Sequence, residues 1–590
     1  MKNTMNDEKY KKIAIGLLEV LCISIVVMII EVIYFGYVNW NFRVPVTYNG
    51  GDAFSGIATM KMRMYGDQNR LGWPFYEDVS RYSPIFNRVS LIAASIINIY
   101  VDDFYVAQNI FLFLIPTINV VVSYFVFRNI KVSKLIAFLG ALIFGFSPYV
   151  QVRLFLHQDL AAVECIPIVF MMCFWLMEDE RFATPCKSFF RYKRNIFLIF
   201  SGWLIANNGI VYYPFFSCFI ILITGLMIAI HSKTIKKIIP SVICIISIVF
   251  WLGIGFIPAI YGAFSGRGDV ATNGTTRDAF RSTCYGLDIR SLLLSPRGFG
   301  FESIKNSYGY LILDDAEQYY SYLGVIGIIG FIILLLFLLI NKKDDNVVIN
   351  RIVLLSRINI MLILLGVSCG IGVIVALFIP FIASYNRVSI FMLFACVTSV
   401  LLLMDLWLHK QKSNKKKYIG LILAFAAILL YGFWEQSKCY AYLDNEMLVM
   451  NSSQLVQDRT FFSKLEESAG EQSMVYVLPY MSSFENGPSG YVSDYEHFRE
   501  YMNTNTIRWS YGAIAGSVND VWNYNTSLMS YEDMINELRD KGFAGIYINV
   551  AAYEGNDGVE VAKGLLDALG IGRDSIIVHE NKYMFYIPIN

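Results

Sequence analysis

The chain has 590 residues, of which 56% are hydrophobic and only 16% are charged. A soluble domain carries about 25% charged residues, so this composition excludes an ordinary soluble protein and indicates several membrane-spanning helices. The formal net charge of +1 excludes a strongly basic protein, and we expect no nucleic-acid partner.

Apolar segments long enough for a hydrocarbon core of ~30 Å recur along the first part of the chain. We predict a transmembrane domain over residues 1–434 with about eleven spanning helices. The predicted spans lie near 13–37, 104–127, 135–150, 160–177, 196–211, 214–230, 239–260, 322–340, 358–379, 385–407 and 418–434. The shorter apolar segment 85–100 predicts a helix that lies in or dips into the outer leaflet.

Basic residues gather between these spans, and they predict how the chain is oriented. The clusters lie at 9–12, 128–134, 187–194, 233–237, 342–343 and 410–417. Each falls where a cytoplasmic loop is needed if the N-terminus is inside, as the positive-inside rule requires. An odd number of spans then places the C-terminus outside. No small-residue cleavage site follows the first span, so we expect this helix to remain as an anchor.

Two long loops fall on the predicted outer side, at 38–103 and 261–321. Both hold many polar residues and glycines that could not face lipid. Asn207-Asn208-Gly209 predicts a tight turn or a broken helix between two spans. Irregular backbone of this kind is tolerated where it lines a wet cavity.

The tail, residues 435–590, changes character and predicts an extracytoplasmic α/β domain. Short apolar or alternating runs at 473–478 and 544–550 predict strands, and helical periodicity occurs at 531–541 and 559–569. Two further runs, Ile576–His579 and Tyr583–Ile587, predict a terminal hairpin.

Asp52 is the first candidate for chemistry. It follows Gly50 and Gly51 a few residues after the first span, and glycines allow close backbone approach and unusual dihedral angles. A carboxylate at this place could deprotonate an acceptor hydroxyl as a general base, or it could hold a divalent cation such as Mg²⁺ or Mn²⁺. The alternative is a plain surface turn with a solvated aspartate.

Four further polar residues on the predicted outer side are candidates for substrate binding. Asp102 and Asp103 lie together before a span, and like charges this close can raise one pKa. His157 and Asp159 lie in a short outer loop, where they could hydrogen-bond a substrate. One histidine and one aspartate are too few to specify a metal site. The alternative for the Asp102 pair is a solvated end of a span.

Arginines at the predicted outer boundary are candidates for phosphate recognition, because a guanidinium can donate two hydrogen bonds to phosphate oxygens at once. Arg387 begins a span from the outer side, and Arg281, Arg290 and Arg297 lie in the second long loop. We predict that Arg387 and at least one of the other three face one outer-leaflet cavity. Simple contacts with lipid headgroups are the alternative.

The segment 81–150 has a recognisable order of features. Arg81–Phe86 opens an apolar helix, a span follows from Phe104, a basic turn lies at Arg128–Lys134, and the next span ends in Phe146–Pro148. This order resembles the membrane glycosyltransferases of the GT-C fold, especially the bacterial YfhO-like family. The resemblance covers residues 1–434 as an architecture.

The resemblance implies particular site residues. Members of this group have an acidic catalytic residue soon after the first span, and Asp52 matches that position. Glu317 and Arg387 resemble polar positions of these proteins less specifically. Asp52 is followed by Ala53, whereas many members have a paired Asp-Glu. That departure leaves open both metal dependence and the identity of the base.

The resemblance also implies a function and a location. We expect a multi-pass protein of the bacterial cell membrane, with a cytoplasmic N-terminus and an extracytoplasmic tail. It would be an inverting hexosyltransferase that takes a sugar from undecaprenyl phosphate in the membrane lipid. The acceptor would be a cell-wall or surface glycopolymer such as teichoic acid. The alternative is a non-enzymatic flippase or transporter of lipid-linked sugars, which would need comparable access from both sides.

Overall fold

The computed structural model describes residues 2–37, 40–48, 50–75, 85–262, 264, 279–311, 317–339, 346–437, 445–483 and 489–589. Two features used above lie outside these ranges, namely the start of the Arg81–Phe86 motif and the basic pair Lys342 and Lys343.

The chain is a multi-pass helical membrane protein. Within the described ranges, eight segments are long and apolar enough to cross a membrane. They are α1 (Lys2–Tyr34), α7 with α8 (Gln158–Ala161 and Cys165–Glu178), α4 (Phe104–Asn129), α10 (Tyr212–His231), α11 (Ile239–Gly262), α17 (Val347–Gly366), α19 (Ser389–Lys410) and α20 (Lys415–Gln436). A ninth is possible if α5 (Lys134–Gly145) and α6 (Pro148–Leu156), which meet at a bend of 43°, form one span.

Among the residues that the structure describes, the number of full-length candidate spans is lower than the eleven expected from the sequence. The predicted spans 196–211 and 322–340 are the helices α9 (Lys193–Ala206) and α16 (Gly324–Phe337), each of 14 residues. Such a helix rises only ~21 Å, which is short of a ~30 Å hydrocarbon core. The predicted span 358–379 is divided, because α17 ends at Gly366 and the short helix α18 (Ile371–Ala376) follows.

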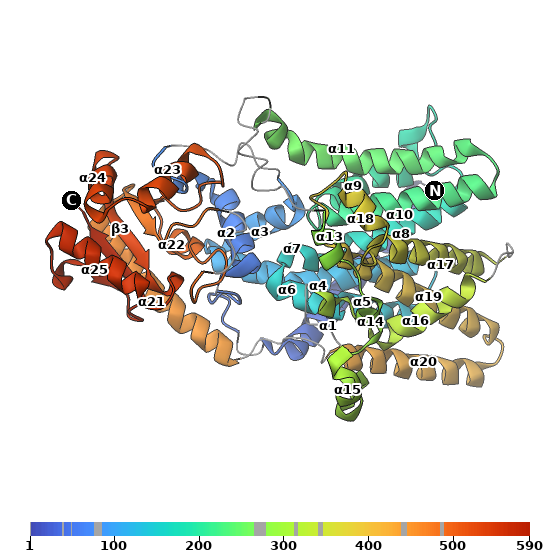
Figure 1. Cartoon of the computed structure of the whole chain (residues 1–590). Coiled ribbons are helices and arrows are strands. Elements are labelled where there is room, and N and C mark those ends of the chain that lie inside the picture. Colours follow the sequence, from blue (N-terminus) through green and yellow to red (C-terminus); the bar gives the residue numbers. More distant parts are fainter. Residues whose placement is uncertain are drawn as a thin grey trace.

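The two ends of the helix bundle differ. At one end, the backbone N–H of Ser133 donates to Asp405 at 2.9 Å, and Lys237 forms an ion pair with Glu180 at 3.2 Å. The first contact joins the α4–α5 turn to α19, and the second joins the segment after α8 to the segment before α11. Four of the six basic clusters, 128–134, 187–194, 233–237 and 410–417, lie in or next to these segments. At the other end lies the tail domain, drawn in orange to red in Figure 1, with α2 (Gly51–Tyr65) and α3 (Arg88–Val101) between it and the bundle.

The tail contains a mixed five-stranded sheet, so the predicted α/β domain is confirmed. The strand order is β2 (Arg508–Trp509), β1 (Met474–Leu478), β3 (Phe543–Asn549), β5 (Met584–Pro588) and β4 (Ile577–Val578). β1 runs parallel to β2 and β3, and β5 runs antiparallel to β3 and β4. The predicted hairpin is therefore the β4–β5 pair.

The alternation of side chains along β3 decides how the sheet packs, since successive residues of a strand point to opposite faces. Ile546 and Ile548 pack with Leu538 of α24 (Tyr531–Asp540) and Leu565 of α25 (Asp557–Leu569). Tyr547 points to the other face and joins the larger core. That face is covered by α21 (Asn445–Ala469), whose Phe461 and Phe462 rings contact Tyr547. The short helix α22 (Phe498–Asn503) then packs on α2.

Candidate active site

Asp52 lies in the first turn of α2, directly after two glycines with positive φ, +53° at Gly50 and +71° at Gly51. The left-handed backbone of this turn suits glycine, because other residues meet a steric cost there. A carboxylate in the first turn also interacts favourably with the positive end of the helix dipole. The Asp52 side chain is 62% exposed, so a substrate can reach it.

Behind Asp52 lies a chain of polar side chains. His157 Nε2 is 3.0 Å from Asp52 Oδ2, and His157 Nδ1 is 3.0 Å from Nη1 of Arg153. Arg153 Nη2 in turn lies 2.6 Å from Glu317 Oε2. An arginine can only donate hydrogen bonds, so Nδ1 of His157 must accept one. Nε2 of the neutral ring therefore carries the proton and donates it to Asp52.

Arg387 completes the group, which we call the Asp52 cluster: Asp52, Arg153, His157, Glu317 and Arg387. Its Nη2 is 3.6 Å from Glu317 Oε2, and its guanidinium lies 4.2 Å from the centre of the Tyr212 ring. Arg387 Nε and the Tyr385 hydroxyl are buried and have no hydrogen-bond partner among the described residues. Buried donors without a partner are costly, so these groups are suited to a ligand.

The charges in the cluster set the ionisation of its acidic members. Burial alone would raise the pKa of Glu317, but the neighbouring Arg153 and Arg387 guanidinium groups outweigh it and hold this pKa well below its usual range. The hydrogen bond from His157 lowers the pKa of Asp52, against the opposing effect of burial. Both carboxylates are therefore ionised at neutral pH.

The same surroundings keep His157 neutral. Burial lowers the pKa of His157, and the charges of Arg153 and Arg387 lower it further, while the hydrogen bond to Asp52 opposes them. This agrees with the tautomer deduced from the contacts. His157 is therefore a fixed donor to Asp52 near neutral pH.

These residues do not fit a divalent cation as they are arranged. Both ring nitrogens of His157 are engaged by Asp52 and Arg153, and Glu317 faces two guanidinium groups. Within the described part of the chain, no group of three or more His, Cys, Asp or Glu side chains is placed to hold a metal ion.

Of the residues predicted from the sequence, the structure brings Asp52, His157, Glu317 and Arg387 together. It places the other predicted residues elsewhere. Asp102 and Asp103 lie beyond the far end of α2, where they line a separate cavity with residues of the tail. Asp103 also caps α4 by accepting from the N–H of Val106.

Asp159, Arg290 and Arg297 also lie apart from the cluster. Asp159 lies near Asn87 and Ser90. Arg290 is exposed and forms an ion pair with Asp288 at 2.6 Å, and Arg297 is exposed as well. The guanidinium that shares Glu317 with Arg387 belongs to Arg153 instead of to a residue of the 261–321 loop.

Sequence reasoning missed Arg153, which is only 1% exposed. A signal was present, because Arg153 is a lone charge in the apolar run 150–156 and lies four residues before His157. Residues four apart share one face of a helix, and an ionisable group at membrane depth usually has a function. Glu164, another buried charge in this region, accepts a hydrogen bond from Asn208 at 2.8 Å.

A family model described as a domain of unknown function, DUF6311, matches residues 68–375, just over half of the sequence. The chain belongs to the DUF6311 family. The matched range includes Arg153, His157 and Glu317, and Asp52 and Arg387 lie just outside it on either side. Membership of the YfhO-like family is not shown by this match and stays a prediction.

Two solved structures are similar to the DUF6311 chain at low sequence identity. ArnT from Cupriavidus metallidurans, bound to undecaprenyl phosphate, is 8% identical with a TM-score of 0.49, covering 97% of this chain and 98% of ArnT. A mutant form of the arabinofuranosyltransferase AftD from Mycobacteria is 10% identical with a TM-score of 0.47, covering 90% of this chain. The chain spans only 36% of the length of AftD. No curated protein matches the sequence significantly.

Proposed function

We propose that this protein is a membrane glycosyltransferase of the GT-C type that transfers a sugar from a polyprenyl-phosphate donor to the hydroxyl of a glycopolymer. The observation that carries the proposal is the Asp52 cluster. It offers one exposed, ionised carboxylate, held by a neutral histidine, beside two buried guanidinium groups. A base for an alcohol and donors for a phosphate are the two groups that this reaction needs.

In the proposed reaction, Asp52 takes the proton of the acceptor hydroxyl as general base. The hydroxyl oxygen then attacks the anomeric carbon of the donor sugar, and the bond from that carbon to the phosphate oxygen breaks. The phosphate leaves with the bonding electron pair. Attack opposite to the leaving group inverts the anomeric centre, which makes the enzyme an inverting transferase.

Arg387 is the proposed partner of the leaving phosphate. Its Nε has no partner among the described residues, and a guanidinium forms strong paired hydrogen bonds with phosphate. Fixed donors aimed at a developing negative charge commonly give the largest single contribution to catalysis. Glu317 and Arg153 are positioning residues in this scheme, since they act on Asp52 through His157.

The orientation is part of the proposal. The basic loops meet at one end of the bundle, and Asp52 with the tail lies at the other. By the positive-inside rule, the Asp52 end should face the outside, where a cell-wall or surface glycopolymer would be the acceptor.

Cysteine labelling tests this orientation. Single cysteines are introduced into a cysteine-free variant, one at Asn581 and one at Ser413. In intact cells, an impermeant maleimide should react only with the cysteine at position 581. Labelling of Asn581→Cys only after lysis would contradict this topology and the proposed acceptor.

The central test is Asp52→Asn, which keeps the size of the side chain and removes the negative charge. Transfer from a polyprenyl-phosphate sugar should fall ~10²–10⁴-fold, while donor binding persists. The matched control is Asp574→Asn, the same change at an exposed position of the tail domain. Normal transfer by Asp52→Asn would remove Asp52 as the base. If wild-type protein moves lipid-linked sugar across vesicles without any transfer, the carrier alternative is correct.

A further inference from the structure

A polar cavity of about 480 Å³ lies between α2 and the tail domain, outside the Asp52 cluster. Three parts of the chain form its wall: the C-terminal half of α2 with the turn after it, the turn between α3 and α4, and the tail helices α21 and α22. The charged side chains of the wall are Lys61, Asp67, Arg70, Asp102, Asp103 and Arg459. We call this space the α2 cavity.

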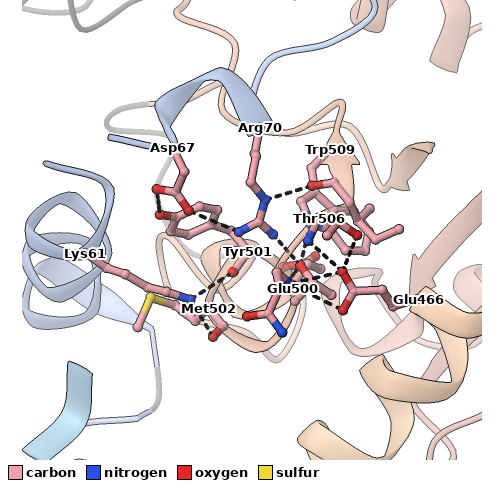
Figure 2. A network of polar contacts seen from close by, with 12 residues as sticks. Lys61, Asp67, Arg70, Glu466, Glu500, Tyr501, Met502, Thr506 and Trp509 are labelled. Carbon is pink, nitrogen blue, oxygen red and sulfur yellow. Dashed lines mark hydrogen bonds and ion pairs between the residues drawn. The ribbon is translucent and has the colours of Figure 1, made fainter. Parts of the chain in front are cut away.

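One side of the α2 cavity is held rigidly by contacts between the membrane part and the tail, which Figure 2 shows. Lys61 Nζ donates to the carbonyl oxygen of Met502 at 3.0 Å. Arg70 donates to Thr504 Oγ1 at 2.7 Å and forms an ion pair with Asp67 at 3.2 Å. The two domains therefore build this wall jointly.

Other groups of the wall are left open. The hydroxyl of Tyr105 and Oδ1 of Asn503 are buried and have no hydrogen-bond partner among the described residues. Asn503 Nδ2 donates to the Tyr48 hydroxyl at 2.8 Å, which fixes the amide. The side chains of Arg459 and Asp102 are exposed, and no ion pair joins either of them to a described residue. Buried polar atoms without a partner are uncommon and indicate a ligand here.

The composition of the wall indicates a neutral, hydroxyl-rich ligand. Three carboxylates balance three cations, so an anionic ligand would face Asp67, Asp102 and Asp103, and a cationic one would face the basic side chains. Sugar hydroxyls both donate and accept hydrogen bonds, and they can pair with carboxylate, guanidinium and amide groups alike. The volume also falls within the ~300–1,000 Å³ of ordinary small-molecule sites.

The α2 cavity and the Asp52 cluster lie at the two ends of one helix. Asp52 is in the first turn of α2, and Lys61 follows nine residues later. At 1.5 Å per residue, the two positions are ~14 Å apart along the helix axis, and at 3.6 residues per turn they point to opposite sides of α2. A short oligosaccharide in the cavity therefore has to pass around α2 to bring its terminal hydroxyl to Asp52.

We propose that the α2 cavity binds a neutral saccharide segment of the acceptor, a few units away from the hydroxyl that Asp52 deprotonates. This inference rests on the proposed transferase function for the role of the bound sugar, but the binding site itself does not. It also assigns a role to the tail domain, which supplies Arg459 and Asn503 to the cavity.

The experiment measures binding of neutral oligosaccharides to the full-length protein by saturation-transfer NMR, in a detergent that carries no sugar headgroup. The panel contains gluco-, galacto-, manno-, rhamno- and N-acetylglucosamine oligomers with the matching monosaccharides. The double variant Asp102→Asn/Arg459→Gln removes two exposed charges of the wall, and asparagine tolerates the left-handed backbone of position 102 (φ 48°). The matched control is Arg573→Gln/Asp574→Asn, at exposed positions of the tail.

At least one oligosaccharide should bind to wild type, Asp52→Asn and the control with the same affinity. Its affinity for the cavity variant should be lower by about tenfold or more, because that variant loses charged hydrogen bonds. The inference is overturned if no panel member binds at millimolar concentration, if the cavity variant binds as wild type does, or if only phosphorylated sugars bind. A monosaccharide that binds as tightly as its oligomers would indicate the donor sugar and also overturn it. Binding without any transfer activity would instead refute the proposed function and leave the saccharide site in place.

Discussion

The backbone N–H of Gly51 donates to the carbonyl oxygen of Asp494 at 2.5 Å, so the tail domain holds the turn that presents Asp52. The neighbouring Arg499 forms an ion pair with the buried Asp458 at 2.9 Å and donates to the carbonyl oxygen of Tyr48 at 3.4 Å. These contacts tie the tail to both sides of the Gly-Gly turn. The tail is therefore part of the support of the candidate base.

Gly50→Ala should disrupt this support. A Cβ at Gly50 would lie 1.8 Å from Oγ of Ser493 and 2.9 Å from the carbonyl oxygen of Asp494, so the 493–496 segment would have to move. The φ of +53° adds a strain of ~1–2 kcal/mol for alanine. We expect transfer to fall at least tenfold and the melting temperature to drop.

Gly51→Ala is the matched control, because it carries the same kind of strain without the clash. Its φ is +71°, but nothing lies within 4 Å of a Cβ there. It should lower the melting temperature by less and keep most of the transfer activity. Equal losses of activity in both variants would show that contact with the tail does not position Asp52.

His157→Phe should change the pH dependence of transfer. The hydrogen bond from His157 lowers the pKa of Asp52, so its removal should raise this pKa toward the ordinary ~3.9. Because the base must be ionised, the acid limb of kcat/KM should move to higher pH. His231→Phe, at an exposed histidine on the basic end of the bundle, should leave the profile unchanged.

The shift in the pKa of Asp52 is best measured from the pH dependence of the transfer rate and not from the pH dependence of stability. A carboxyl with a depressed pKa stabilises the fold above its unfolded pKa, and this contribution is lost as the pH falls through its folded pKa. Asp52 is 62% exposed, so its contribution to stability is screened by solvent. An acid limb that stays in place in His157→Phe would refute the proposed hydrogen bond as the means of tuning Asp52.

Glu317→Gln should destabilise the protein. It leaves the Arg153 guanidinium, which is 1% exposed, without its carboxylate partner, and breaking a buried ion pair in this way typically costs ~3–5 kcal/mol. The melting temperature should fall clearly, whereas Glu302→Gln at an exposed position of α15 (Glu302–Tyr308) should leave it unchanged.

The double variant Glu317→Gln/Arg153→Met separates stability from positioning. Replacing both partners of a buried pair by neutral groups is often neutral for stability, so the melting temperature should largely recover. Transfer should stay low, because His157 no longer receives the hydrogen bond of Arg153 that fixes its tautomer. Recovery of both properties would make the pair purely structural.

The sequence predicted elements that local periodicity defines, and it failed where a partner lies far away in the chain. The tail strands and the helix before Gly570 follow from alternation and capping, and Gly570 does adopt the left-handed C-cap conformation. No local sequence pattern predicts that Asp102 lines a cavity with Arg459, because the two residues are 357 positions apart in the sequence. The number of spans differs for a related reason, because α9 and α16 are apolar like the other spans, but each has only 14 residues.

The arginines show the same limit within the candidate site. All four arginines lie on the predicted outer side of the membrane. From the sequence, Arg281, Arg290 and Arg297 were therefore as good candidates for phosphate ligands as Arg387. In the structure, Arg290 forms an ion pair with Asp288, two residues before it, and this local contact removes it as a candidate. A long-range contact selects Arg153, through Glu317. Only the packing of the bundle could distinguish these cases.

Arg387→Lys tests phosphate recognition, because it keeps the charge and loses the planar, paired donors. Arg387 has an Nε without a partner among the described residues and lies 3.6 Å from Glu317, so the ammonium should still pair with Glu317 while the leaving phosphate loses a donor. Loss of one such donor costs ~10²–10³-fold in kcat, and we expect a fall in kcat with a smaller change in the KM for the polyprenyl-phosphate sugar. Arg290→Lys is the control, since this exposed residue pairs with Asp288 and should transfer at the wild-type rate. An unchanged kcat in Arg387→Lys, or an equal fall in Arg290→Lys, would contradict the role assigned to Arg387.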